Sequence, residues 1–220
     1  MLYLASNTRP DISFAVHHFA RFTHNTKVSH ETAEQRICRY LQGTKDNGLV
    51  FNLPKKLVVD CYDDADFAGL WGHEDPQDPI CAIIRTGFVV NFSNFPLLWV
   101  SKIQTEIALS TLHYEYVALS HSVRALLPLK SLIKEVIVKL GIDSDNLKFV
   151  SSSTIYEDNK GDIVVSTSPR MNPTSKHIAV KYHWFRQHVV NEFVILEDRV
   201  RKPESRYFHQ RFTRSNICKD

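Results

Sequence analysis

The hydrophobic period of the chain changes at Leu49, and this change constrains the fold more than any other feature. Before it, apolar residues recur every three or four positions, as on one face of a helix. The series comprises Ile12, Ala15, Val16, Phe19 and Phe22. A second helical stretch has Ser29 at the N-cap position and ends at Gly43. The pattern therefore predicts helices within 11–43.

After Leu49 the apolar residues gather in short β-branched and aromatic runs, separated by Asn, Pro and Asp clusters. The runs are 49–51, 56–62, 81–92 and 96–102. They predict three or four antiparallel strands. Further along, 148–158 has the pattern of another strand, and 194–200 is a candidate closing strand.

A long amphipathic stretch, 110–142, separates these two groups of strands and predicts a helix that Gly141 closes. Pro128 lies inside it and lacks a backbone donor, so we expect a kink or a second helix starting there. Two later segments complete the pattern: 159–169 predicts a short helix or turn, and 176–193 predicts a final helix. Strands and helices in this order predict an α+β fold with helices on both faces of a sheet.

The charge balance is only mildly basic. Lys and Arg number 27 against 24 Asp and Glu, a net charge of +3, which excludes a protein that binds phosphate through net charge alone. The charge is unevenly spread, because 57–78 is acidic and 199–214 is rich in Arg. This asymmetry fits an acidic site flanked by basic surface, and a solvated charge run is the alternative interpretation.

Neither the cysteines nor the apolar segments indicate secretion. The four cysteines are widely scattered and lack the spacing of a zinc site, so we interpret them as reduced intracellular thiols. The N-terminal sequence lacks the apolar core of a signal peptide. No run approaches the ~20 apolar residues of a membrane span. We therefore expect a soluble intracellular protein.

Three carboxylates stand out by position. Asp64 and Asp158 each follow a predicted strand, and Glu115 lies in the first turns of the long predicted helix. Carboxylates that converge in this way are the hard ligands that Mg²⁺ prefers, and two such ions support phosphodiester hydrolysis. A strand-end Asp is also ordinary turn chemistry, and this alternative stays open on spacing alone.

Several stretches resemble, in the same order, the C-terminal part of the Pol polyprotein of copia-type LTR retrotransposons. "YLASNTRPDISFAV" resembles the family's "YL..TRPDI.FAV", and "RICRYLQGTKDNGLVF" resembles "RYL.GT...GL.F". "YDDADFAG" is similar to "Y.DADWAG", "STLHYEYVAL" to "SS.EAEY.AL", and "YEDNKGDI" to "..DN..AI". "FPLLWVSKIQT" and "SKHIAVKYHWFR" are similar to the family's "I.W.SKKQ" and "TKHI...YHF.R" segments.

The resemblance implies a ribonuclease H-like fold: a mixed five-stranded sheet, three antiparallel strands and then parallel ones, preceded by a helical segment. It implies that 1–48 is a remnant of the reverse-transcriptase thumb or connection and that 49–198 is the ribonuclease H-like domain. The basic tail, 199–220, matches no family motif, and we expect it to be poorly ordered.

For the site, the resemblance implies that Asp64, Glu115 and Asp158 are the metal-binding catalytic acids, holding two Mg²⁺ or Mn²⁺ ions. The stretch Tyr62-Asp63-Asp64 also looks like the Tyr-x-Asp-Asp hairpin of a polymerase palm. However, Asp63 stands where relatives often carry Thr or Ser, so this likeness is interpreted as accidental.

The substrate implied by the resemblance is an RNA–DNA hybrid, contacted through its backbone and 2′-OH groups. The candidate contacts are Lys102, Gln104, Asn159, Lys160, Lys176 and His177. For each, a solvated surface role is the alternative. His183 is a candidate for protonating the leaving group or steering product release, with a plain helix-face histidine as the alternative.

Two functions follow. The first is a ribonuclease H that acts during reverse transcription, with the rest of the reverse transcriptase as partner, in a cytoplasmic retrotransposon particle or in the nucleus. The second is an inactive retroelement relic that binds nucleic acid weakly. The intact triad favours the first. Ala179, at a position where the family often has a fourth acid, and the unmatched tail favour the second.

Overall fold

In the computed structural model of the chain, the described residues are 1–47, 56–66, 84–93, 95–105, 110–141, 148–167, 184–191 and 194–198. The predicted strand 49–51 lies outside them, as do the tail after residue 198 and most of the predicted helix over 176–193.

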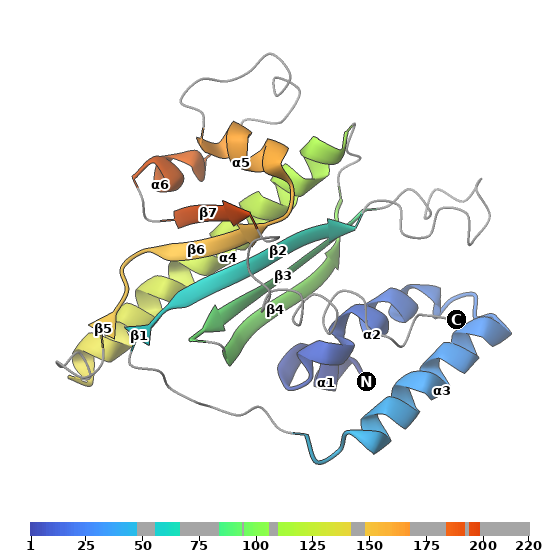
Figure 1. Cartoon of the computed structure of the whole chain (residues 1–220). Helices are drawn as coiled ribbons and strands as arrows, with labels where there is room; N and C mark the ends of the chain where they lie inside the picture. Colours follow the sequence, from blue (N-terminus) through green and yellow to red (C-terminus); the bar gives the residue numbers. More distant parts are fainter. Residues whose placement is uncertain are drawn as a thin grey trace.

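A five-stranded mixed sheet forms the centre of the molecule (Figure 1). Its order is β4-β3-β2-β6-β7, and β2 is the middle strand. The strands are β2 (Val59–Asp66), β3 (Arg85–Phe92), β4 (Phe95–Ile103), β6 (Ser153–Glu157) and β7 (Val194–Asp198). β3 is antiparallel to both β2 and β4, whereas β6 adds in parallel to β2 and β7 in parallel to β6. This arrangement confirms the predicted fold class.

The predicted strand over 148–158 is two strands, not one. β5 (Lys148–Phe149) pairs in parallel with β1 (Lys56–Leu57) in a separate two-stranded sheet. The chain bends at residues 151–152, and β6 then begins at Ser153 in the main sheet. Three consecutive serines, 151–153, separate the two apolar segments, so no side chain there supports a continuous strand.

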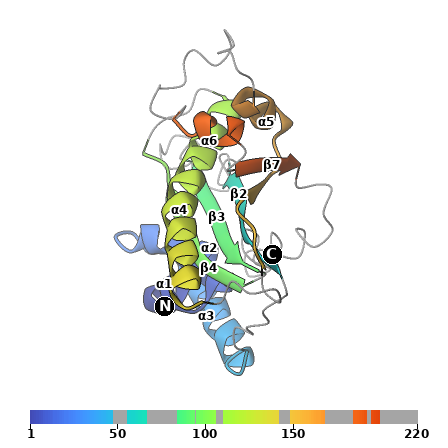
Figure 2. The ribbon, with the colours of Figure 1, turned by 90° about the vertical axis from the view of Figure 1, so that its left-hand side faces the viewer.

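The long helix α4 (Thr111–Lys139) covers one face of the sheet, as Figure 2 shows. Side chains of α4 at helical spacing pack against inward-facing residues of β2, β3 and β6. They are Tyr116, Val117, Leu119, Val123 and Leu126, against Val59, Cys61, Phe88, Val90 and Ile155. The alternation of Val59 with Asp60 and Cys61 with Tyr62 is the two-residue period that gives a strand one buried face.

Helix α4 runs through Pro128 without ending, so of the two predicted outcomes, a kink or a second helix, the second helix does not occur. An interior proline removes one hydrogen bond and costs about 3 kcal/mol. Each fully buried apolar side chain contributes about 1.5–3 kcal/mol. Leu126 before the proline and Ile137 after it are both buried, and their burial is enough to offset that cost.

Two shorter helices lie beyond the parallel strands: α5 (Lys160–Thr167) and α6 (Arg186–Val190). Helix α5 contacts α4 and β7, and α6 contacts β7. The short helix predicted over 159–169 and the closing strand predicted over 194–200 are therefore confirmed. Of the final helix predicted over 176–193, the described part is α6.

The N-terminal segment is helical, as predicted, and begins with a helix that the periodicity did not indicate. The elements are α1 (Leu2–Asn7), the 3-10 turn η1 (Pro10–Ile12), α2 (Ser13–Phe19), the 3-10 turn η2 (Ala20–Phe22) and α3 (Val28–Gly43). The predicted N-cap Ser29 was wrong, because α3 already begins at Val28. The backbone N–H of Lys27 donates to Nδ1 of His30 at 3.1 Å, which provides the cap instead.

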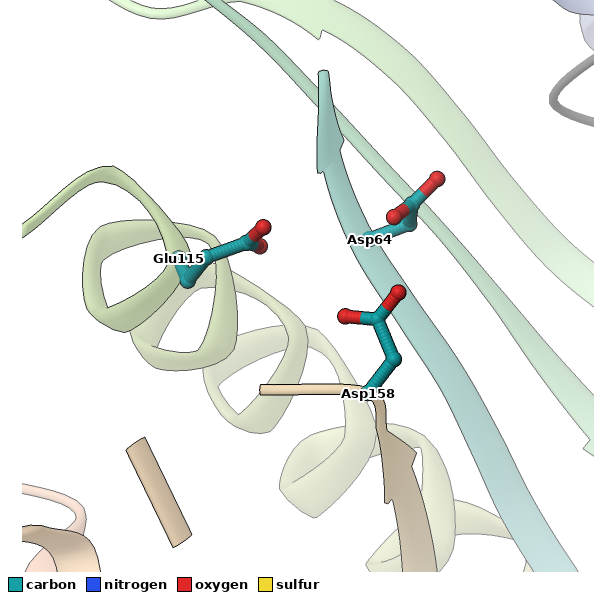
Figure 3. A group of neighbouring side chains, drawn as sticks. All are labelled: Asp64, Glu115 and Asp158. Atoms are coloured by element: carbon teal, nitrogen blue, oxygen red, sulfur yellow. The ribbon is translucent and has the colours of Figure 1, made fainter. Parts of the chain in front are cut away.

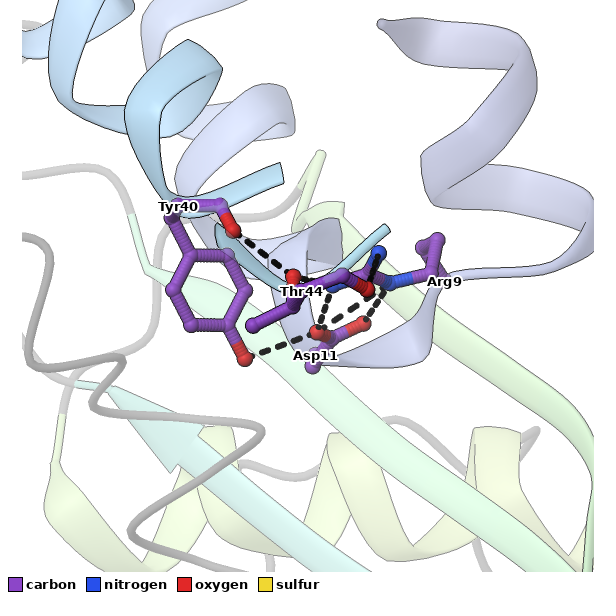
Figure 4. Close-up of polar contacts among 4 residues, drawn as sticks. All are labelled: Arg9, Asp11, Tyr40 and Thr44. Carbon is purple, nitrogen blue, oxygen red and sulfur yellow. Dashed lines mark hydrogen bonds and ion pairs between the residues drawn. The ribbon is translucent and has the colours of Figure 1, made fainter. Parts of the chain in front are cut away.

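A polar network centred on Asp11 holds this segment together (Figure 4). Its carboxylate accepts from Nη2 of Arg9 at 2.7 Å and from the Tyr40 hydroxyl at 2.9 Å. The Arg9 guanidinium also donates to the Thr44 hydroxyl, at 2.6 Å. These bonds tie the "TRPD" segment to Tyr40 and Thr44 at the C-terminal end of α3. The N-terminal helices share a small core formed by Ala5, Ile12, Ala15, Val16 and Ile37.

The N-terminal segment packs on the sheet face opposite α4. Trp99 alternates along β4 with Leu98 and Val100, which pack toward the α4 core. Its indole N–H therefore points the other way, and it donates to the carbonyl of Ala5 at 2.6 Å. Arg85 donates to the carbonyl of His17 at 3.3 Å from the same sheet. Helices thus cover both faces, as predicted.

Candidate metal centre

Strand β2 carries two consecutive aspartates whose side chains point to opposite faces. Asp63 is fully buried, and its Oδ2 accepts from the hydroxyl of Ser122 on α4 at 3.2 Å. Asp64 is partly exposed. Parallel pairing of Tyr62 with Tyr156 ends the ladder between β2 and β6 next to Asp64, so this residue lies where the two strands part.

Helix α4 places Glu115 in its second turn. Ser110 caps the helix, because its hydroxyl oxygen accepts from the backbone N–H of His113 at 3.2 Å. Glu115 therefore lies near the N-terminal end, and it is only 7% exposed. Its Oε2 has no hydrogen-bond partner within the part of the chain that the structure describes.

Asp158 lies in the turn between β6 and α5. The preceding residue, Glu157, accepts the backbone N–H groups of Asp158 and Asn159 on its Oε1, at 3.0 and 3.1 Å. Asn159 then caps α5, with its Oδ1 accepting from the N–H of Gly161 at 2.9 Å. The Asp158 side chain itself is exposed to solvent.

The three predicted acids converge from three different elements (Figure 3). One carboxylate oxygen each of Asp64, Glu115 and Asp158 lies within 4.8 Å of the other two. All three donors are carboxylate oxygens, and Glu115 has one oxygen, Oε2, that is buried without a hydrogen-bond partner among the described residues. This donor set fits a hard divalent cation such as Mg²⁺ or Mn²⁺.

The concentration of negative charge changes the acidity of the site. Burial, followed by the charges of Asp64 and Asp63, raises the pKa of Glu115 to about 10. Burial and the charge of Asp158 raise the pKa of Asp162 to about 8. Both shifts favour the protonated acid, and a bound cation would reverse them by favouring the carboxylate.

The sequence analysis did not predict that Asp63, Glu157 and Asp162 form an inner group of buried acids. Each is 0% exposed. Burial and the charge of Asp64 raise the pKa of Asp63 well above its usual range, and burial and the charge of Asp63 do the same for Glu157. The available signal was strand alternation: Asp63 follows buried Cys61, and Glu157 follows buried Ile155, at a spacing of two. Asp162 stands where the family motif "..DN..AI" has Ala.

Gln104 lies inside the molecule, not on its surface. Its Nε2 donates to the Thr86 hydroxyl at 2.8 Å and to the carbonyl of Tyr114 at 3.0 Å. The amide therefore joins β3 to the start of α4. A side chain held in this way is part of the packing beneath the site. Its burial does not fit the predicted direct contact with a nucleic acid.

The other candidate contacts have different surroundings. Lys102 is exposed near the end of β4, and Asn159 is occupied by its bond to Gly161. The ammonium of Lys160 lies 3.6 Å from Asp198, with the Lys160 side chain 79% exposed. Lys176, His177, Ala179 and His183 lie outside the described residues.

Two further features of the described residues are the state of the cysteines and the character of the helices. Among the described residues, Cys38 is an exposed and Cys61 a buried free cysteine. Among the helices that the structure describes, none has the length and apolar character needed to cross a membrane.

Comparison with known protein sequences shows that this chain is similar to part of several Pol polyproteins. A Pol polyprotein from the transposon RE2 of Arabidopsis thaliana is 31% identical over 96% of this chain and 14% of its own length. A Pol polyprotein from the transposon TNT 1-94 of Nicotiana tabacum is 32% identical over 87% of this chain and 13% of its own length. The chain belongs to the copia-type Pol polyproteins. It spans about one-seventh of the length of these relatives.

No family model matches the chain. Among solved structures, a ribonuclease H1 isolated from compost, LC11-RNase H1, matches with a TM-score of 0.40 and 16% identity, over 67% of this chain and 91% of that one. The mixed five-stranded sheet, three antiparallel strands followed by parallel ones, is the arrangement that the sequence motifs implied.

Proposed function

We propose that the chain is a metal-dependent ribonuclease H that cleaves the RNA strand of RNA–DNA hybrids during reverse transcription. The observation that carries this proposal is the convergence of Asp64, Glu115 and Asp158, with one oxygen of each within 4.8 Å of the others. Membership of the Pol family supplies the context, because a Pol polyprotein copies RNA into DNA and so produces the hybrid.

The proposed division of roles follows from position. Asp64 lies near the end of β2 and Asp158 directly follows the adjacent strand β6, and we assign these two residues to hold two divalent ions. Glu115 would complete the ligand set from α4. Its carboxylate would also orient the attacking water. When bound there, the cations lower the pKa of the attacking water and neutralise charge on the leaving oxygen.

Further proposals concern the residues around the three acids and the division of the chain into segments. We propose Lys102 as a backbone contact to the hybrid, since its charge is exposed near the site-proximal end of β4. Lys160, Lys176, His177 and His183 stay proposals of the same kind. Residues 1–48 are proposed as the reverse-transcriptase remnant, 49–198 as the ribonuclease H domain and 199–220 as a basic tail, with the rest of the polyprotein as partner in a cytoplasmic particle.

The test is cleavage of an RNA–DNA hybrid, labelled on the RNA strand, by the full chain with Mg²⁺ or Mn²⁺. We expect the wild type to cleave and EDTA to abolish cleavage. Asp64→Asn and Glu115→Gln should reduce the rate by roughly 10²–10³-fold or more, the scale of losing a major electrostatic group. Glu135→Gln is the matched control on α4, because Glu135 is exposed and pairs with Lys139 at the far end of the helix.

Absence of cleavage by the folded wild type would contradict the proposal. If that protein still bound Mn²⁺ and retained affinity for the hybrid, the chain would be the non-catalytic relic, a nucleic-acid-binding remnant. Equal cleavage by the wild type and by Asp64→Asn would instead show that the activity does not arise from this site.

A further inference from the structure

The turn that carries Asp158 has two backbone N–H groups that neither neighbouring element can satisfy. Asp158 and Asn159 follow the last residue of β6 and precede the first residue of α5. They are therefore beyond the strand ladder and too early for the helix ladder. Both N–H groups donate to the same atom, Oε1 of Glu157, at 3.0 and 3.1 Å.

The side chain of Glu157 lies in the interior of the protein. It is fully buried, and strand alternation directs its side chain to the face opposite that of Asp158. Within the described part of the chain, its second oxygen, Oε2, has no hydrogen-bond partner. An unsatisfied buried carboxylate oxygen lowers stability, so a simple packing role would be served better by an apolar residue.

The rest of the turn is held as closely. Asn159 caps α5, and Gly161 lies so near α4 that a Cβ there would come within 3.0 Å of both Oδ1 of Asn159 and Cδ1 of Leu112. Leu112 precedes Glu115 by one helical turn on α4. Glu157 therefore holds the turn through two hydrogen bonds, and the close approach of Leu112 on α4 leaves no room for a side chain at Gly161. The turn lies next to the point where the three site carboxylates meet.

We propose that Glu157 is the positioning residue of the metal centre: by accepting the N–H groups of Asp158 and Asn159 it sets the backbone from which Asp158 reaches the metal. This inference rests on the proposed function for its catalytic consequence, but the contact itself can be tested without catalysis. The essential property is an acceptor oxygen at the right reach. Gln keeps that oxygen, Asp keeps the charge but is one methylene shorter, and Ala has neither.

The experiment compares Glu157→Gln, Glu157→Asp and Glu157→Ala in the full chain, with Glu197→Ala as the matched control. Glu197 is exposed on β7 and pairs with Tyr156, so it shares the sheet but not the turn. The readouts are amide hydrogen exchange at residues 158 and 159 by NMR, Mn²⁺ affinity by EPR, and kcat and KM on the hybrid.

We expect Glu157→Gln and Glu197→Ala to stay within about threefold of the wild type in Mn²⁺ affinity, with amide protection kept at 158 and 159. Glu157→Asp and Glu157→Ala should lose this protection and at least about tenfold in Mn²⁺ affinity, the usual effect of removing a partner that orients a metal ligand. In cleavage, kcat should fall and KM should change little.

Two results would overturn the inference. One is wild-type amide protection or wild-type Mn²⁺ affinity in Glu157→Asp, a variant expected to fold even if Glu157→Ala does not. The other is a Glu157→Gln protein as impaired as Glu157→Asp, which would show that an acceptor oxygen at the right reach is not sufficient. A wild type that does not cleave the hybrid refutes the proposed function alone, because exchange and Mn²⁺ affinity still decide the role of Glu157.

Discussion

Ser122 donates a hydrogen bond to Oδ2 of Asp63 at 3.2 Å, which joins α4 to the middle strand of the sheet one residue before Asp64. Ser122 and Glu115 are seven residues apart on α4, about two turns, so they lie on the same side of the helix. The bond therefore helps set where α4 lies along β2, and with it the approach of Glu115 to Asp64.

Ser122→Ala should accordingly lower the free energy of unfolding by about 1–3 kcal/mol, because a buried carboxylate loses one of its donors. The measurement is urea denaturation followed by circular dichroism. Ser131→Ala is the matched control on the same helix, where an exposed hydroxyl bonds the carbonyl of Leu127, and it should change stability by no more than about 0.5 kcal/mol. Equal effects of the two substitutions would contradict the structural role of the Ser122–Asp63 bond.

Divalent cations should stabilise the fold. A ligand at 100 times its Kd adds about 2.7 kcal/mol to the free energy of unfolding. For a chain of this size, that corresponds to a rise in Tm of roughly 5–10 °C. Glu115→Gln should abolish most of the rise, whereas Glu135→Gln should keep it. Differential scanning calorimetry with and without Mn²⁺ makes the comparison, and an unchanged Tm for the wild type would show that no ion binds.

Metal affinity should increase with pH. The pKa of Glu115 without metal is about 10, so at neutral pH this acid is protonated and must release its proton when a cation binds. Each proton released makes the apparent affinity rise by up to about tenfold per pH unit. Isothermal titration of Mn²⁺ at pH 6, 7 and 8, in buffers of different ionisation enthalpy, measures both the affinity and the proton count. A pH-independent affinity would argue against Glu115 as a ligand.

Without metal, stability should decline as the pH rises. The pKa of Asp162 in the folded state is about 8, above its ordinary value of 3.8, so the folded state binds more protons than the unfolded state between these values. This contribution is fully present below pH 3.8 and is lost as the pH rises through about 8. In EDTA, Tm should therefore fall between pH 5 and 8, and less steeply in Asp162→Asn. A steeper fall in that variant would contradict the prediction.

Substitution of Gln104 should lower stability, whereas substitution of Lys102 should weaken hybrid binding, although both residues were predicted to contact the hybrid. Gln104→Ala leaves a buried carbonyl and a hydroxyl without their donor, and should cost about 1–3 kcal/mol of stability. Lys102→Ala should leave stability nearly unchanged but weaken hybrid binding, with a salt dependence reduced by about one phosphate contact. Thermal denaturation and fluorescence anisotropy across a salt series separate the two. The reverse pattern would mean that the surface role belongs to Gln104.

The sequence was a good guide where a periodic pattern matched the tertiary environment. The antiparallel strands, the long helix and the closing strand all follow from apolar spacing, since each buries one face against its neighbours. The failures occurred where packing outweighed a local rule. Pro128 ought to end a helix, but the apolar side chains on either side keep α4 on the sheet. Ser29 is a better N-cap by type than Lys27, but the His30 ring provides the bond instead.

The candidate site shows a different limit. Asp64, Glu115 and Asp158 were chosen by their resemblance to a family motif, and the structure brings them together. Asp63 was set aside because relatives often carry Thr or Ser at that position. The burial of Asp63 and Glu157 was not predicted, because a charged residue is expected on the surface, where most are found. Their burial follows from the alternation of each strand combined with the position of α4, and the second of these facts is a long-range property that no window of sequence contains.

The register of β2 has an evolutionary consequence. Eight consecutive residues of this strand, Val59 to Asp66, pair with β3, and two also pair with β6. A shift by one residue would send Asp64 inward and bring Asp63 to the outer face, while turning every apolar residue of the strand toward the wrong side. Intermediate positions do not exist, so a lineage cannot move this arrangement of carboxylates gradually along the strand. It can lose the site by substitution, but it can relocate it only by rebuilding the sheet.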